Sequence, residues 1–400
     1  MRVPSTSVRS VVGTLFVING VLVGTWVSRI PALKAQFVLT DAALGVALLF
    51  VASGSLVAFP FAGRVVTRSG GAWLAVAGAL LMCVALPAAA FAPSAVLLWA
   101  ALFAFGAGNG ANDVAMNAQA VEVERARGRP LLSSFHAMWS SGALLGAGIG
   151  AALIVAGRTP AEHFVLVVGV AAAVLILGVS VPIRSLPVAP RRGRSTVPAP
   201  AFSLPPRALA GVGVVVFAAA LAEGAVGDWS AVYLLEGVGT TEASATAGYA
   251  AFAVAMLVAR ALGDALTARW GPVRVVALGG LIATLGLAVA LLVALPWLSV
   301  LGFACVGWGV ASAFPLAFSA AGNMPRVDPG TGVAAVATMG YAGFLVGPLA
   351  IGVLAEGASL RLALGVVVLC AALMGALAVS LRPATPPTVR DPGVRSGSRR

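Results

Sequence analysis

Apolar runs long enough to cross a lipid bilayer recur along the whole chain, about twelve of them, separated by short polar breaks that carry nearly all of the arginines. A transmembrane helix needs about 20 apolar residues, so 400 residues supply twelve such helices and leave little for a water-soluble domain. Only 10% of the residues are charged, whereas soluble domains have roughly 25%. The pattern therefore predicts an all-α integral membrane protein.

The predicted spans follow one another at short intervals from end to end of the chain. They are Val11–Trp26, Ala43–Ala62, Ala72–Phe91, Ala95–Val121, Leu131–Ala156, Phe164–Val181, Leu209–Leu235, Ala243–Leu266, Val273–Leu295, Ser299–Gly322, Gly332–Ala355 and Leu362–Leu381. The first run follows a short basic stretch, as the apolar part of a secretory signal does, but no small-residue cleavage pattern follows it. We expect it to be a retained first helix.

The basic residues of the short loops predict the orientation. With the N-terminus in the cytoplasm, twenty arginines lie on the cytoplasmic side, and only Arg29, Lys34, Arg158 and Arg361 lie outside. We therefore expect a multi-pass protein of the inner (cytoplasmic) membrane with both termini in the cytoplasm. The net charge of +12 then indicates contact with acidic lipid head groups, and we expect no nucleic-acid partner.

The chain is organised as two related halves. Its longest polar connection lies at the middle and is rich in proline and arginine, which is typical of a linker. We expect a six-helix bundle over residues 1–182, a cytoplasmic linker over 183–207, a second six-helix bundle over 208–382 and a disordered basic cytoplasmic tail over 383–400.

Three sequence echoes relate the halves. Gly24-Thr25-Trp26 recurs as Gly227-Asp228-Trp229, and the loop at 63–70 recurs more loosely at 263–271. The glycine-rich fifth run, with Gly142 and Gly146, matches the eleventh, with Gly343 and Gly347. Small residues at this spacing let helices approach closely, and two related bundles form a cavity at mid-membrane in many carriers.

Over essentially its whole length the chain resembles the major facilitator superfamily. Gly63, Arg68 and Gly70 carry the family's glycine-arginine-glycine signature, although Thr67 stands where an acid is usual. In the second copy of this loop, Asp264 is displaced upstream of Ala268, the corresponding position. The stretches 112–119 and 228–234 are similar to the bacterial branch near the fucose permeases. The resemblance implies two pseudo-symmetric six-helix bundles that act as a monomer.

Ionisable residues within the spans are the candidates for proton coupling, because each is costly in lipid unless it faces protein or water. Asp113 lies about 13 Å, at 1.5 Å per residue, from the end of its span, and His136 lies at similar depth on the next one. We hypothesise that Asp113 and His136 interact and that their protonation is coupled to opening. Glu223 lies on a helix interrupted by glycines, which in carriers tends to line the binding site. The alternative for all three is a structural polar network that never titrates.

Further polar and aromatic residues are candidates for the substrate cavity. The fourth apolar run carries several polar residues on one helical face. The first, seventh and eighth runs carry further polar and aromatic residues, and some of these equally suit anchors at the membrane interface. The predicted set is Asn19, Trp26, Arg29, Asn109, Asn112, Asn117, Asp228, Trp229 and Tyr249.

Charged residues near the cytoplasmic ends of the second and eighth spans are candidates for a gate. The resemblance implies such a clamp, and the set is Arg64, Arg68, Arg260, Asp264 and Arg269. Arg260 and Asp264 have the spacing of a helical ion pair. The alternative is a plain surface role that follows from orientation alone.

The function predicted is secondary active transport of a small organic solute, because the chain has no phosphate-binding loop for ATP. Ala147 replaces a proline typical of drug exporters, and no arginine lies between Leu97 and Asp113, so we favour proton-coupled uptake of a polar, sugar-like solute. Efflux of an amphipathic metabolite or drug is the alternative, and a non-transporting membrane sensor is a third. We expect no enzyme, cofactor or metal, since only His136 and His163 exist and His163 is placed in an outside loop.

Overall fold

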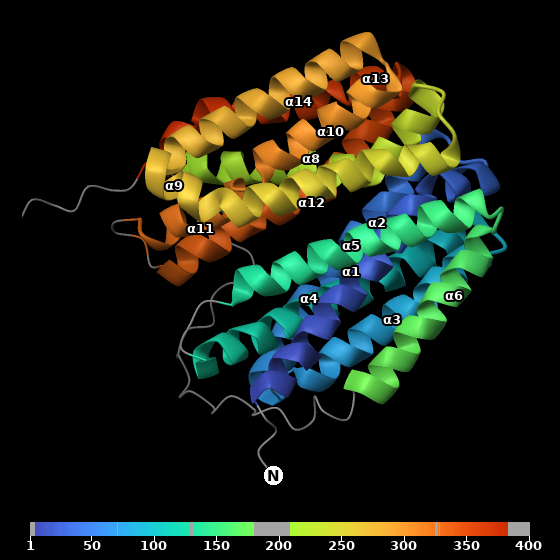
Figure 1. Cartoon of the computed structure of the whole chain (residues 1–400), viewed down its shortest axis with the longest axis horizontal. Coiled ribbons are helices and arrows are strands. Elements are labelled where there is room, and N and C mark those ends of the chain that lie inside the picture. The colour runs from blue at the N-terminus through green and yellow to red at the C-terminus, as the bar shows by residue number, and fades with distance from the viewer. Residues whose placement is uncertain are drawn as a thin grey trace, which may run out of the picture.

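A computed structural model describes residues 5–69, 71–127, 131–179, 209–324, 327 and 329–382, which are helical with short connections and contain no strand. The predicted linker at 183–207 and the tail at 383–400 lie outside these residues, as does Gly70. The helices form two groups that lie side by side (Figure 1).

The first group, blue to green in Figure 1, contains the helices before the central connection. They are α1 (Ser5–Gln36), α2 (Asp41–Ser69), α3 (Ala72–Ala90), α4 (Ala95–Arg127), α5 (Leu132–Val155), α6 (Pro160–Ala173) and the π-helical turn η1 (Val174–Val179).

The second group, yellow to red, contains the helices after it. They are α8 (Ala210–Val232), η3 (Tyr233–Gly237), α9 (Glu242–Val293), α10 (Pro296–Val310), α11 (Ala313–Gly322), α12 (Pro329–Gly357), α13 (Leu360–Ala363), α14 (Gly365–Ala376) and η4 (Leu377–Leu381).

The element α9 consists of two helices joined at a kink, and it contains two of the predicted spans. Its backbone leaves the helical region at Gly271, where φ is 77° and ψ is 160°, and Pro272 follows directly. Glycine adopts a positive φ without steric cost, so the chain reverses here between two antiparallel segments. The described residues contain 11 apolar helices long enough to cross a membrane, with α9 counted as one. Because α9 crosses twice, they make twelve spans, as the sequence predicts.

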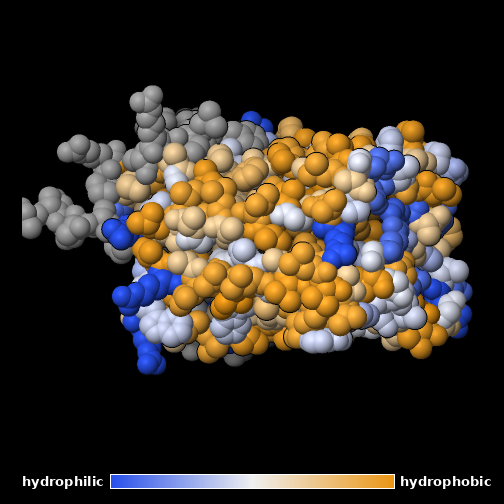
Figure 2. Space-filling model, turned by 90° about the horizontal axis from the view of Figure 1, so that it is seen from above, coloured by the Kyte–Doolittle hydropathy of each residue, from blue (hydrophilic) through white to orange (hydrophobic). Residues whose placement is uncertain are grey.

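The molecule has a polar end on each side of an apolar belt. We call the end where α1 begins and η4 ends the termini end, and the end with the α1–α2 and η3–α9 connections the far end. Figure 2 shows orange residues along most of the length and hydrophilic residues gathered towards the ends. Large side chains such as Leu177, Leu292 and Leu369 are exposed in this belt, which is typical of a surface that contacts lipid.

Glycine pairs bring equivalent helices together in the two groups. A side-chain carbon at Gly142 on α5 would lie 2.2 Å from the carbonyl oxygen of Val17 on α1. In the second group, the same carbon at Gly343 on α12 would lie 2.4 Å from the carbonyl oxygen of Phe217 on α8. The glycine echo of the fifth and eleventh runs thus corresponds to two close helix crossings.

Candidate functional site

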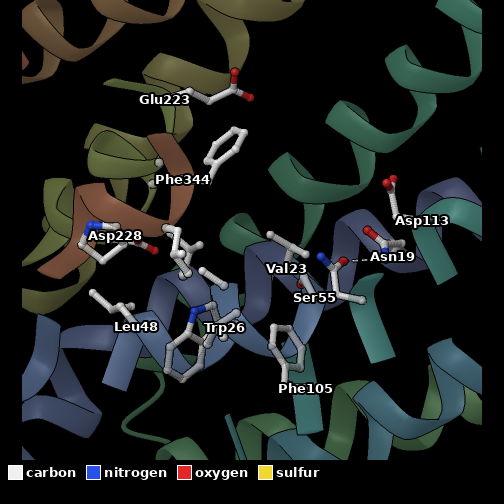
Figure 3. Close-up of a pocket in the computed structure, with 18 of the residues that line it drawn as sticks. Asn19, Val23, Trp26, Leu48, Ser55, Phe105, Asp113, Glu223, Asp228 and Phe344 are labelled. Atoms are coloured by element: carbon white, nitrogen blue, oxygen red, sulfur yellow. Dashed lines mark hydrogen bonds between the residues drawn. The ribbon is translucent and has the colours of Figure 1, made fainter. Parts of the chain in front are cut away.

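A cavity of about 380 Å³ lies between the two groups of helices, near the middle of the molecule. We call it the central chamber. Residues of α1, α2, α4 and α5 line it from one side, and residues of α8, α9 and α12 line it from the other (Figure 3). Eight of its lining residues are aromatic: Trp26, Phe59, Phe105, Trp139, Tyr249, Phe252, Tyr341 and Phe344.

A second cavity, of about 610 Å³, adjoins the first on the side of the termini end. We call it the terminal chamber. The two chambers share a ring of lining residues: Asp113, Trp139, Ser140, Glu223, Tyr341 and Phe344. Exposed residues such as Asp264 and Pro315 belong to the wall of the terminal chamber, so the joined space reaches the surface at the termini end.

A cluster of amides forms one wall of the central chamber. Asn19 donates to Oδ1 of Asn109 at 3.0 Å and to Oδ1 of Asn112 at 2.9 Å, and its own Oδ1 accepts from Nε1 of Trp139 at 2.6 Å. Asn112 donates in turn to the carbonyl oxygen of Ala75 at 2.5 Å. The cluster joins α1, α3, α4 and α5, and it presents Asn19 and Asn109 to the chamber.

Two of the predicted cavity residues on α4 lie behind this wall. Asn112 is fully buried, and Asn117 donates through Nδ2 to Oδ1 of Asp113 at 3.0 Å. Neither lines the central chamber. They support the residues that do: Asn112 fixes Asn19, and Asn117 fixes Asp113.

Three carboxyl groups line the central chamber, and they differ in their partners. Asp113 accepts from Asn117, and Glu223 forms an ion pair with Arg260, whose Nη2 lies 3.6 Å from Oε1. Asp228 has neither a hydrogen bond nor an ion pair with any residue that the structure describes. The central chamber therefore holds one carboxyl group that is not engaged by the protein.

The expected ion pair between Arg260 and Asp264 is not formed. Arg260 instead reaches across from α9 to Glu223 on α8, while Asp264 lies exposed at the terminal chamber. Attraction between charges is stronger where water is excluded, so the half-buried Glu223 is a better partner than a solvated aspartate one turn away.

Asp113 and His136 both line the terminal chamber. No hydrogen bond joins them in the part of the chain that is described. His136 instead packs edge-on against Phe16, with ring centroids 5.6 Å apart. Their functional coupling remains a prediction.

The far end is closed by a polar cluster around Arg29. Its side chain donates to Nδ1 of His163 at 3.0 Å, to the carbonyl oxygen of Arg158 at 2.8 Å and to Glu242 of the second group at 3.2 Å. Arg29 and His163 are almost fully buried. This corrects two expectations: Arg29 belongs to the far-end closure rather than to the cavity lining, and His163 lies within α6 rather than in a loop.

A second set of contacts reinforces this closure. Nζ of Lys34 contacts Oδ1 of Asp41 at 2.6 Å, and it also pairs with Glu236 of the second group. The backbone nitrogen of Ala42 donates to Glu356 at 3.2 Å. The two groups of helices are therefore joined by charges at the far end.

The remaining predicted residues lie in different places. Trp26, Asp228 and Tyr249 line the central chamber, whereas Trp229 is fully buried within the second group and does not line it. The remaining gate candidates, Arg64, Arg68 and Arg269, are exposed near the termini end.

Sequence reasoning missed several residues of this site. Trp139, Tyr341 and Phe344 line both chambers but were indistinguishable from packing aromatics. The far-end acids had a usable signal, since Asp41, Glu236, Glu242 and Glu356 stand at span ends on the side with only four basic residues.

Known proteins are similar to the chain over most of its length. The model of the Major Facilitator Superfamily matches residues 212–399. The uncharacterized transporter y4wD of Sinorhizobium fredii is 41% identical, covering 92% of the chain and 96% of the relative. The uncharacterized MFS-type transporter YPO1221 of Yersinia pestis is 36% identical, and the match covers 92% of the chain and 94% of the relative. Membrane protein MosC of Rhizobium meliloti is 32% identical, and the match covers 90% of the chain and 88% of MosC.

Solved structures share the fold at low sequence identity. The nucleoside transporter NupG superposes with a TM-score of 0.71 at 12% identity, covering 94% of the chain and 98% of NupG. A bacterial homolog of the lysosomal transporter Spinster, in an inward-facing conformation, gives 0.66 at 15% identity and 94% of each chain. From its relatives, its twelve spans and its two groups of helices, the chain belongs to the major facilitator superfamily, and it is a membrane transporter rather than an enzyme.

Proposed function

We propose that the chain is a proton-coupled carrier that takes up a small polar, sugar-like solute by alternating access. The observation that carries the proposal is the convergence of an amide cluster and three carboxyl groups on one chamber between the two groups of helices.

The chamber suits a small solute with hydroxyl groups. Its volume of about 380 Å³ falls within the range typical of small-molecule sites. Asn19, Asn109 and Ser140 supply hydrogen-bonding groups, while rings such as Trp26 and Phe105 supply flat apolar surfaces for the less polar faces of such a molecule.

The ion pair between Glu223 and Arg260 offers a physical route for proton coupling. A proton on Glu223 removes its negative charge and so weakens the attraction to Arg260. Because this pair joins α8 to α9 beside both chambers, its release would change how these helices pack. In this proposal Asp113 and His136, on the opposite wall, take up the proton on its way through the terminal chamber.

Orientation, oligomeric state and lineage complete the proposal. The distribution of arginines supports an inner-membrane protein with both termini in the cytoplasm, and in that orientation a structure closed at the far end is inward-facing. The protein acts as a monomer, with acidic lipids around the termini end, and belongs to the branch near the fucose permeases. Labelling of a cysteine placed at Arg390, in a protein without Cys83, Cys305 and Cys370, tests the orientation: an impermeant reagent should react in inverted vesicles and not in intact spheroplasts.

Uptake by purified protein in liposomes tests the function. Hexoses, pentoses, polyols and nucleosides are added outside at pH 6 with pH 7.5 inside, and accumulation is compared with that at equal pH. Accumulation of a polar solute that requires the gradient supports the proposal. Binding without accumulation indicates the sensor, and accumulation unaffected by the gradient excludes proton coupling.

Efflux of an amphipathic compound is a second candidate, favoured by the eight aromatic residues around the central chamber. In the same liposomes, expulsion of a fluorescent amphiphile against its gradient, with no response to any polar solute, would establish efflux instead.

A further inference from the structure

Asp228 is a carboxyl group without a protein partner inside the membrane-spanning part of the molecule. The other two carboxyl groups of the central chamber are engaged by Asn117 and Arg260, but Asp228 has no hydrogen bond or ion pair to any residue in the described ranges. An unpaired charge at such a depth is costly. Because Asp228 lines the chamber, a group that enters the chamber is able to supply the partner that the ionised carboxylate lacks.

Asp228 shares the central chamber with aromatic side chains, among them Trp26 and Tyr249. Gly227 lies beside it on α8, and a side-chain carbon there would be 4.0 Å from Cε2 of Tyr249. Figure 3 shows Asp228 on the side of the chamber where Trp26 lies, opposite Asn19 and Asp113. Aromatic faces attract cations, with Trp and Tyr among the best, so a carboxylate beside such rings is a suitable receptor for an ammonium group.

Among the residues that the structure describes, no basic side chain shares the wall of the central chamber with Asp228. None of the described residues that line the central chamber is Arg, Lys or His. The basic residues nearest the far end are committed elsewhere: Arg29 to His163 and Glu242, and Lys34 to Asp41 and Glu236. Arg260 is likewise engaged by Glu223, so a positive charge that pairs with ionised Asp228 would be supplied by a ligand in the chamber.

We infer that Asp228 binds a protonated amine of the transported solute, so that the carrier's substrate is a small hydroxylated amine rather than a neutral sugar. This inference rests on the proposed function and specifies its substrate class. The ammonium group lies between Asp228 and the rings of Trp26 and Tyr249, and the hydroxyl groups face Asn19 and Asn109 across the chamber.

Matched pairs of amine and neutral compounds test the inference. Purified protein is titrated at pH 7 with glucosamine and glucose, galactosamine and galactose, and 1-amino-2,3-propanediol and glycerol, and binding is measured by thermal shift and by calorimetry. The members of each pair differ by an ammonium group in place of a hydroxyl. We expect an amine to bind at least about tenfold more tightly than its neutral partner, since loss of one charge from a buried pair has at least that effect.

Substitutions at Asp228 distinguish an effect of its charge on amine binding from an effect on folding. Asp228→Asn should weaken amine binding at least about tenfold and remove the preference over the neutral partner, and Asp228→Glu should restore part of it. Glu162→Gln is the matched control, because its side chain is 51% exposed at the far end and lies outside the chamber, and it should bind as wild type does.

The outcomes distinguish this inference from the proposed function. Equal or tighter binding of the neutral members, unchanged amine binding by Asp228→Asn, or no binding of any amine would each overturn the inference. Proton-driven accumulation of a neutral sugar would overturn it while leaving the proposed function standing. Absence of accumulation of every polar solute, amines included, would overturn both.

Discussion

At the residue scale, the central chamber depends on polar groups that satisfy one another inside an apolar belt. Asn19 connects Asn109, Asn112 and Trp139, so a single amide orders one wall. Buried polar groups that lose their partner retain the full cost of leaving water. Removal of this amide should therefore disrupt the hydrogen bonds of the whole wall.

Asn19→Ala should lower the free energy of unfolding by about 1–3 kcal/mol, because it leaves the buried Asn112 oxygen and the Trp139 indole without their partner. Thermal unfolding in detergent measures the effect. Ser141→Ala, which removes an exposed hydroxyl that bonds its own helix, is the control and should change little. Equal unfolding temperatures for Asn19→Ala and wild type would show that the amide cluster is not structural.

At the element scale, the helices are positioned by close backbone crossings that only glycine permits. On α5, Gly142 faces α1 closely, whereas a side-chain carbon at Gly148 would meet nothing within 4 Å. The same helix thus contains one glycine where an added side chain would clash and one where it would not.

Gly142→Ala should destabilise the protein by about 1–3 kcal/mol, as overpacking of a filled interior does, because the added carbon would lie 2.2 Å from the Val17 carbonyl oxygen. Gly148→Ala should be neutral or slightly stabilising, since alanine is the better helix former. Chemical or thermal unfolding of the two variants compares them directly. A larger loss for Gly148→Ala would contradict the packing described for α1 and α5.

The sequence predicts these elements well but not the contacts between them. Apolar length located all twelve spans, and even the reversal within α9 falls between two predicted runs, at Gly271 and Pro272. Local spacing favoured an Arg260–Asp264 pair, but Arg260 pairs with Glu223. The partner of Arg260 depends on how α8 and α9 face each other, and a helical repeat within one segment does not contain that information.

At the scale of the whole molecule, the two groups of helices are fastened at one end and separated by a cavity towards the other. Arg29 and Lys34 of the first group pair with Glu242 and Glu236 of the second. In a carrier these contacts must break when the far end opens, so they set the balance between the two states.

Arg29→Ala should shift that balance towards opening at the far end, because it removes a buried contact between the groups. A cysteine at Ser55 in the central chamber, in the protein without native cysteines, should then react faster with an impermeant thiol reagent added to intact cells. Arg158→Ala is the control, since among the described residues its side chain pairs with Glu162 of the same group and with none of the second group. No gain in labelling for Arg29→Ala would contradict the assignment of Arg29 to the closure.

In the proposed mechanism, proton movement through the chamber drives accumulation of the solute, and Glu223→Gln tests this coupling most directly. The test uses liposomes and a solute that wild type has been shown to accumulate. Wild type should concentrate that solute faster as the outside pH falls below the inside pH. Glu223→Gln cannot lose and regain a proton, so it should still exchange labelled for unlabelled solute but should not concentrate it under the gradient. Accumulation by Glu223→Gln that follows the pH gradient as in wild type would contradict proton coupling through Glu223.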